Sequence, residues 1–136
     1  MAAIGLAVVE QFFERVSRRR AMAGKWIAAL HDTPVRIFNE NVNCAPWQVF
    51  PVLLPESEMV EDFVREMSLE GIEIRRYYTP SLGECRGMTH WETCPNAKDL
   101  AGRAVALPMR SWMPDADQSD MMARTVAVLR SVCEAV

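Results

Sequence analysis

The sequence predicts an α+β domain, a two-layer sandwich in which helices pack against one small mixed or antiparallel sheet. Apolar residues recur at helical spacing near both ends of the chain. Between these two helices lie short apolar or alternating runs of strand length, interrupted by one further helical segment. A chain of 136 residues can bury one genuine core. We therefore expect a single domain over residues 1–136.

The composition excludes several classes of protein. Hydrophobic residues make up 50% of the chain, which is too many for intrinsic disorder. The net charge of −3 offers no overall field for a polyanion, so nucleic acid is not an expected partner. No apolar run is long enough to span a membrane, and no secretory leader is apparent. With four cysteines in such a chain, we expect free thiols and a cytoplasmic location.

The N-terminal third predicts one long helix followed by two strands. Residues 3–30 contain no proline and carry an amphipathic helical pattern, which Pro34 ends. Residues 35–38 alternate and suggest a short strand. After an Asn-rich loop, residues 47–54 form an apolar run of strand length. Pro51 cannot donate to a ladder, so we expect an edge, a bulge or a strand side that lacks a partner there.

The middle of the chain predicts a helix, a strand and a long loop. Ser57 is placed to cap a helix with an apolar stripe, and Gly71 is placed to end it in the left-handed conformation. Residues 72–78 alternate between apolar and polar side chains and predict a strand. Residues 79–95 contain several proline and glycine residues and predict irregular structure.

The C-terminal part predicts two more helices around a strand. Asn96 is placed to cap a short helix over residues 97–103, and residues 104–108 predict a short strand. Asp115 and Gln118 have the spacing of a capping box that opens the last helix. The final element order is helix, strands, helix, strand, helix, strand, helix.

Several segments resemble a known family in the order in which that family carries them. They are AAIGL at 2–6, FPV at 50–52, GIEIRRYYTPSL at 71–82, CPNA at 94–97 and VALP at 105–108. Together they resemble the C-terminal small domain of the DegT/StrS family of PLP-dependent nucleotide-sugar aminotransferases. The resemblance implies the small domain of a fold-type I aminotransferase over residues 34–136. Residues 1–33 would be the helix that joins the large and small domains.

The resemblance also implies candidate substrate-binding residues. Arg75 matches the Arg position of the family's strand, where its planar fork suits a carboxylate or a phosphate. Its neighbours Arg76, Tyr77 and Tyr78 complete the candidate set, and one tyrosine is expected in the core. In the alternative interpretation, Arg75 or Arg76 forms an ordinary ion pair with Glu73 or another surface acid.

The chemistry of the family depends on parts that this sequence does not contain. In the family, the large domain supplies the lysine that forms the PLP Schiff base, the acid that pairs with the pyridine nitrogen and the phosphate-binding cup. The chain has two lysines, Lys25 and Lys98, and both are expected to be solvated. We therefore expect that the isolated chain holds no PLP, has no catalytic residue and is inactive alone.

Other candidate sites are weaker. Cys85, His90 and Cys94 could form half of a zinc site, with Cys44 or Cys133 as a further ligand. Their spacing is irregular, so we expect no metal. A nucleophilic cysteine with His90 as base lacks an accompanying oxyanion motif.

Arginine and tryptophan side chains provide the remaining candidates. A basic cluster near the N-terminus could bind a phosphate, although a solvated helix face is the simpler interpretation; it comprises Arg15, Arg18, Arg19 and Arg20. Indole side chains are expected in the core or in an interface; they belong to Trp26, Trp47, Trp91 and Trp112.

Three functional hypotheses follow. In the first, the chain is a remnant or interaction domain that forms a homodimer through its N-terminal helix, which would otherwise expose an apolar face. In the second, it is one part of a split aminotransferase that a separate large-domain chain completes. In the third, it is a small module that binds nucleotide sugars.

Overall fold

The computed structural model describes residues 2–77, 79–85 and 94–134. Helices α1 (Ala2–Glu10) and α2 (Phe12–Leu30) precede strands β1 (Arg36–Ile37) and β2 (Phe50–Leu53). Helix α3 (Met59–Leu69), the short 3-10 helix η1 (Leu82–Glu84) and helix α4 (Pro95–Arg103) follow. Strand β3 (Ala104–Leu107) and helix α5 (Asp115–Glu134) complete the chain. The predicted α+β class is confirmed.

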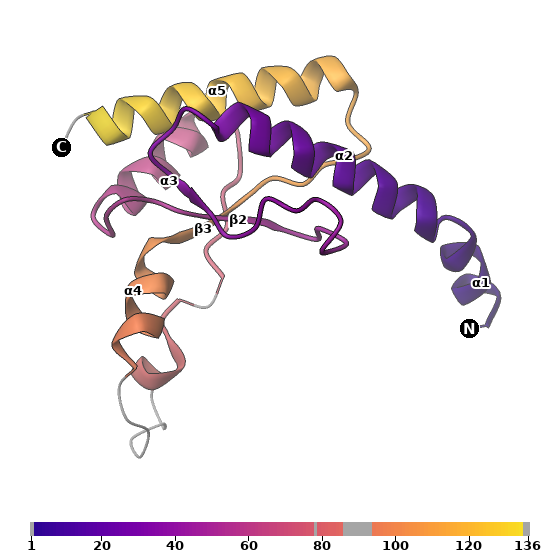
Figure 1. Ribbon diagram of the computed structural model, residues 1–136, viewed down its shortest axis with the longest axis horizontal. Helices are drawn as coiled ribbons and strands as arrows, with labels where there is room; N and C mark the ends of the chain where they lie inside the picture. The colour runs from indigo at the N-terminus through magenta and orange to yellow at the C-terminus, as the bar shows by residue number, and fades with distance from the viewer. Residues whose placement is uncertain (1, 78, 86–93, 135–136) are drawn as a thin grey trace.

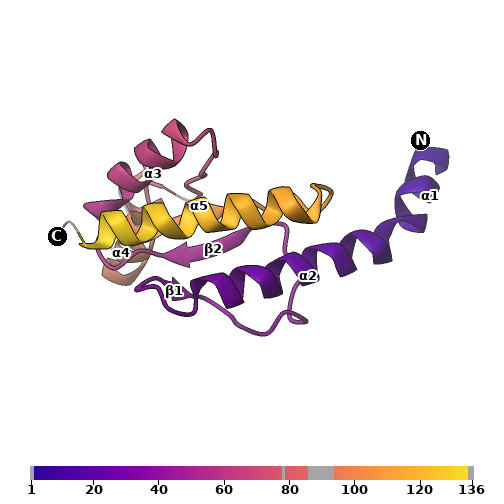
Figure 2. The same cartoon turned by 90° about the horizontal axis from the view of Figure 1, so that it is seen from above.

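The three strands form one antiparallel sheet in the order β1-β2-β3. Helices α2, α3 and α5 lie together over one face of this sheet (Figures 1 and 2). Helix α4 lies on the opposite side, at the bottom of Figure 1. The result is the expected pair of layers with one additional short helix.

The core lies between the sheet and the three covering helices. Phe50 pairs with Leu107, and Val52 pairs with Val105, so these four side chains share one face of the sheet. The helices contribute fully buried side chains to the same core; among them are Met22, Trp26, Leu30, Val60, Phe63, Met67 and Leu129. Helices α2 and α5 are therefore buried along one side each.

Within the described residues, no helix is both long enough and apolar enough to cross a membrane.

Pro51 lies in the central strand, not at an edge. It pairs with Ala106, whose own backbone N–H and C=O both bond to Arg75 on the far side of β3. The backbone of Pro51 therefore points toward β1, which ends at Ile37, opposite Val52. The prediction that proline would occupy a strand side without a partner is confirmed, and that of an edge strand is wrong.

The predicted single helix over residues 3–30 is interrupted at Gln11. This residue has φ −91° and ψ −4°, so its ψ departs from the regular helical value of about −42°. Helix α1 consequently turns away from the axis of α2 and projects beyond the sheet (Figure 2). The helical pattern is present on both sides of the break, but the sheet does not extend under α1 to hold it in line.

Three predicted helix caps are wrong. Helix α3 begins at Met59, and the hydroxyl of Ser57 donates to the neighbouring Glu58 carboxylate instead of accepting from the helix. Helix α4 begins one residue before Asn96, with Pro95 in its first turn, where the missing N–H costs nothing.

The capping box expected for α5 is also absent. Asp115 is the first helical residue, and its carboxylate accepts from Lys25 Nζ at 2.8 Å. Gln118 is buried, and its amide donates to the Met113 carbonyl at 2.7 Å. Tertiary partners have replaced the local cap.

The glycine that ends α3 is confirmed. Gly71 has φ +70°, and its N–H donates to the Ser68 carbonyl. The N–H of Ile72 donates to the Met67 carbonyl at 2.9 Å. This pair of bonds is a Schellman motif, which favours glycine because a left-handed residue with a Cβ is strained.

Candidate functional site

The segment after Gly71 carries the predicted substrate-binding residues, but it is not a regular strand. Only Arg75 pairs with β3, through bonds of 3.4 and 2.8 Å with the backbone of Ala106. The expected alternation is nevertheless present, since Ile72 and Ile74 are buried, whereas Glu73 and Arg75 are exposed. The pairing of one residue is enough to direct the Arg75 side chain away from the core.

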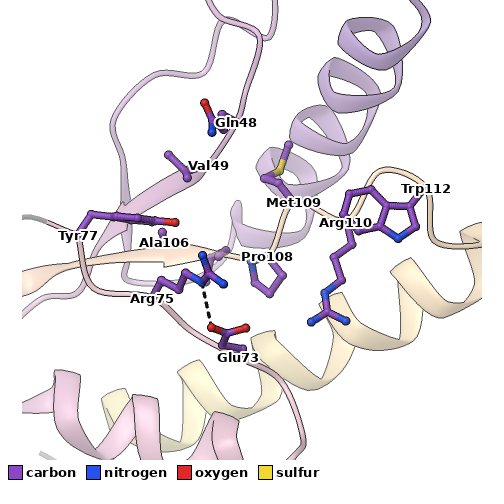
Figure 3. Close-up of a pocket in the computed structure, with 11 residues that line it drawn as sticks. Gln48, Val49, Glu73, Arg75, Tyr77, Ala106, Pro108, Met109, Arg110 and Trp112 are labelled. Atoms are coloured by element: carbon purple, nitrogen blue, oxygen red, sulfur yellow. Dashed lines mark hydrogen bonds and ion pairs between the residues drawn. The ribbon is translucent and has the colours of Figure 1, made fainter. Parts of the chain in front are cut away.

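Arg75 lies in an open hollow of about 330 Å³ on the surface of the sheet (Figure 3). The hollow collects residues from three separate stretches of the chain. They are Gln48 and Val49 before β2, the segment with Glu73, Arg75 and Tyr77, and residues from Ala106 to Arg110 together with Trp112. This volume is at the small end of the range for ligand sites.

The Arg75 guanidinium is held by two neighbours. It donates a hydrogen bond to Tyr77, and its Nε donates to Glu73 Oε1 at 2.9 Å. The hydrogen bond to Tyr77 and then the bond and charge of Glu73 raise the pKa of Arg75 above its ordinary value, so the side chain stays charged. The ion pair with Glu73 is the one that the alternative interpretation of the sequence anticipated. An incoming anion would have to share the guanidinium with Glu73.

The structure brings only part of the predicted set together. Arg75 and Tyr77 line the hollow, and Tyr77 is partly exposed. Arg76 points elsewhere, with its Nη2 donating to the Gly102 carbonyl at 3.2 Å near the end of α4. Tyr78 lies outside the described residues.

Three residues that line this hollow were not predicted for it: Gln48, Arg110 and Trp112. They come from loops beside β2 and β3, and no motif connects them to the strand of Arg75. Trp112 is 72% exposed and lies outside the core, which leaves an interface as its predicted place, whereas Trp26 and Trp47 are buried. Trp91 lies outside the described residues. The signal that could have identified the loop is the Pro-Met-Arg-Ser-Trp run directly after the apolar strand.

Both lysines of the chain are engaged in ion pairs. Lys25 Nζ lies 2.8 Å from Asp115 Oδ1 and 3.2 Å from Gln118 Oε1. Lys98 Nζ lies 3.2 Å from Glu84 Oε1 and is 69% exposed. An anchor for PLP needs a lysine that is desolvated and able to lose its proton. The described residues therefore do not fit the anchoring of PLP.

The cysteines of the predicted zinc and nucleophile sites differ in their surroundings. Cys85 donates to the Ser81 carbonyl at 3.6 Å, Cys44 and Cys94 are exposed, and burial raises the pKa of the Cys133 thiol. His90 lies outside the described residues. Among the described residues, no three histidine, cysteine, aspartate or glutamate side chains gather as a metal site would require.

The basic cluster of α2 divides into different roles. Arg18 pairs with Glu14 at 2.6 Å, and Arg15 donates to Gln11. Arg20 donates to the carbonyls of the loop that precedes β2, at 3.2 Å for Asn43. The side chain of Arg19 makes no hydrogen bond or ion pair with another residue in the described part of the chain.

The model of the DegT/DnrJ/EryC1/StrS aminotransferase family matches residues 1–126. The chain belongs to this family. No curated protein sequence matches it.

Solved structures share the fold of this family member. An aminotransferase TlmJ from Streptoalloteichus hindustanus superposes with a TM-score of 0.86 at 20% identity, over 97% of this chain and 36% of that one. Helicobacter pylori PseC, an aminotransferase involved in the biosynthesis of pseudoaminic acid, has a TM-score of 0.84 at 13% identity, over 95% and 36%. DesI, solved in the presence of its TDP-sugar product, has a TM-score of 0.79 at 21% identity, over 98% and 36%. The aminotransferase-family chain described here thus spans about a third of the length of these neighbours.

Proposed function

We propose that this 136-residue chain is an aminotransferase small domain that does not transaminate alone and acts as an interaction domain. The proposal that the chain does not transaminate alone rests on the surroundings of its two lysines. Both ammonium groups face carboxylates, Asp115 for Lys25 and Glu84 for Lys98. A Schiff-base lysine must be desolvated over the cofactor, whereas 38% of the Lys25 side chain and 69% of the Lys98 side chain are exposed.

The test of inactivity uses PLP and borohydride on the purified chain. We expect no yellow absorbance at one equivalent of PLP, no stoichiometric adduct on Lys25 or Lys98 by mass spectrometry, and no transfer of an amino group from glutamate to a keto-sugar nucleotide. Stoichiometric labelling of one lysine together with amino transfer would overturn the proposal. Labelling without transfer, equal in the Lys25→Gln and Lys98→Gln variants, would indicate only surface reaction and leave it standing.

The second part of the proposal concerns the N-terminal helices. Phe13 is 80% exposed, and Leu6, Val9 and Phe12 are also exposed, with the two phenylalanine rings packed edge to face at a centroid distance of 5.6 Å. Exposed apolar side chains gathered in this way are typical of an interaction surface.

A second copy of the chain is the occupant that the charges favour. Along α1 and α2 the acidic residues Glu10 and Glu14 precede the basic residues Arg15, Arg18 and Arg19. In an antiparallel pair, the acidic stretch of one copy lies beside the basic stretch of the other. A twofold dimer pairs the same surface on both copies and satisfies this pattern twice.

The oligomeric state tests this surface directly. We expect sedimentation equilibrium to show a dimer, and Phe13→Ser to convert it to a monomer. Leu69→Ser is the matched control because Leu69 is 76% exposed on α3, far along the chain from the proposed surface. A monomeric wild-type chain, or equal effects of the two substitutions, would contradict the proposal.

A second candidate function is that of one chain in a split aminotransferase. It is favoured by the coverage of 36% in the structural neighbours, which leaves room for a separate lysine-bearing large domain. In that complex, Arg75 and Tyr77 would face a bound anionic substrate. If mixing with such a domain restores amino transfer, we expect Arg75→Gln to raise KM more than it lowers kcat. Absence of complementation would leave the interaction domain as the better proposal.

A further inference from the structure

Two of the four cysteines border one arm of the molecule, which consists of η1 and α4 and projects below the sheet (Figure 1). Cys85 directly follows η1, and Cys94 directly precedes α4. Both thiols are free, with Cys94 exposed and Cys85 partly buried. The other two cysteines belong to different regions, since Cys44 lies in the loop before β2 and Cys133 lies near the end of α5.

The two halves of this arm run antiparallel and are tied together along their length. The hydroxyl of Thr79 donates to the Ala101 carbonyl at 2.8 Å, near the end of α4. Five residues further along the chain, Glu84 Oε1 lies 3.2 Å from Lys98 Nζ, in the first half of α4. Moving forward through η1 therefore corresponds to moving back along α4. The two segments approach the loop that joins them side by side.

The cysteines come next in this order of contacts. Cys85 is adjacent to Glu84, and its N–H donates to the Leu82 carbonyl at 3.2 Å, which keeps it against η1. The N–H of Lys98 donates to the Cys94 carbonyl at 3.1 Å, so Cys94 lies one helical turn before Lys98. The ion pair between Glu84 and Lys98 thus places both cysteines at the same end of the arm.

The Cys85 thiol is weakly held in its present position. It donates to the Ser81 carbonyl at 3.6 Å, and a thiol is a poor hydrogen-bond donor. Breaking this bond leaves the Ser81 carbonyl beside the exposed surface of the arm, and it frees the sulfur to turn toward α4. The approach of the two backbones matters more, because the Cα atoms of a disulfide are usually about 4.4–6.8 Å apart.

We propose that Cys85 and Cys94 form a redox-sensitive pair that closes as a disulfide and clamps η1 to α4. The oxidant is a low-molecular-weight disulfide such as oxidised glutathione. The Cys94 thiolate attacks one of its sulfurs, the S–S bond breaks, and one glutathione thiolate leaves. The Cys85 thiolate then attacks the Cys94 sulfur and displaces the second glutathione. Two electrons pass to glutathione, and the two cysteine protons end on its two thiols.

Peptide mapping of the oxidised chain tests this pairing. The purified protein is equilibrated with oxidised and reduced glutathione, alkylated and digested with trypsin without reduction. Trypsin cuts after arginine and lysine, and the sequence has Arg86 between the two cysteines, so the disulfide links peptide 77–86 to peptide 87–98. We expect this linked pair to be the main disulfide product in mass spectrometry and to separate on reduction with dithiothreitol.

The contribution of the folded structure is measured by repeating the equilibration in denaturing urea. We expect the equilibrium constant for closing the disulfide to be at least about fivefold larger in the folded chain, a coupling of ordinary size. Because such coupling is reciprocal, oxidation should also raise the urea midpoint of the wild type. Equal closure in urea and in buffer would show that the arm does not bring the thiols together and would overturn the proposal.

Single cysteine variants supply the controls. Cys94→Ser should abolish the linked pair and the rise in urea midpoint, and circular dichroism checks that it folds. Cys44→Ser is the matched control, because it also removes an exposed thiol and should leave both unchanged. The proposal fails if Cys44 or Cys133 appears in the main linked product, if both arm cysteines carry glutathione without closing, or if oxidation joins separate chains instead. Neither lysine nor the N-terminal helices take part, so these outcomes are independent of the proposed function.

Discussion

Helix α2 is exposed along its first half and buried along its second. Phe12 and Phe13 point into solvent, whereas Met22, Trp26 and Leu30 are almost completely covered. Both halves carry large apolar side chains at helical spacing, so the pattern alone does not distinguish them. What differs is the neighbour: the sheet and α5 lie beside the second half, and they stop short of the first. The second half stabilises this chain, and the first half is available for another surface.

The prediction with the largest expected effect replaces one aromatic residue in each half of helix α2. Trp26→Ala removes a fully buried ring that stacks on Phe50 and donates to the Pro108 carbonyl at 3.0 Å. We expect it to lower the free energy of unfolding by about 3–5 kcal/mol, because a large cavity and an unpaired carbonyl remain. Phe13→Ala should change it by less than about 0.5 kcal/mol. Urea denaturation of dilute samples, where any dimer dissociates, measures both, and similar losses would refute the contrast.

A smaller test compares two glycines. Gly71 has φ +70° at the end of α3, so Gly71→Ala should lower the free energy of unfolding by about 1 kcal/mol through backbone strain. Gly5 lies in α1 with open space around its Cα. Gly5→Ala should increase helical content in circular dichroism, because alanine favours helix, without moving the urea midpoint. A shift of the midpoint in Gly5→Ala would show that α1 unfolds together with the core.

The smallest effect concerns the ion pair that joins the buried half of α2 to α5. The hydrogen bond and charge of Lys25 lower the pKa of Asp115 below its ordinary value of about 3.9. A lowered folded pKa means that the contribution is present above the ordinary pKa and is lost as pH falls through the folded value. The stability gap between wild type and Lys25→Gln should therefore be constant above about pH 5 and shrink below about pH 4.

Measuring urea midpoints of both proteins across this range checks the sign. Glu84, whose pKa is lowered by hydrogen bonds from Ser81 and Lys98, titrates in the same range in both proteins. Its contribution therefore cancels in the difference. A gap that does not depend on pH would show that Lys25 contributes through Gln118 and packing alone.

The candidate site was predictable in its centre and not at its edges. The alternation of the segment around Arg75 correctly placed Ile72 and Ile74 inward and Arg75 outward, and the ion pair with Glu73 follows from their spacing of two. Arg76 was assigned to the same set, yet its side chain reaches Gly102 on α4. The loop of Arg110 and Trp112 reaches the site only because β3 runs beside Arg75, a contact between residues far apart in the chain.

The sequence alone determined the class of fold, the strands around Phe50 and Val105, the glycine end of α3 and the family. These depend on local periodicity, on φ preferences and on the order of motifs, all of which are properties of the local sequence. Tertiary structure alone decided the break at Gln11, the start of each later helix and the partners of both lysines. Helix ends and charged side chains can pair with several partners at similar energies. Only the packed chain determines which partner is within reach.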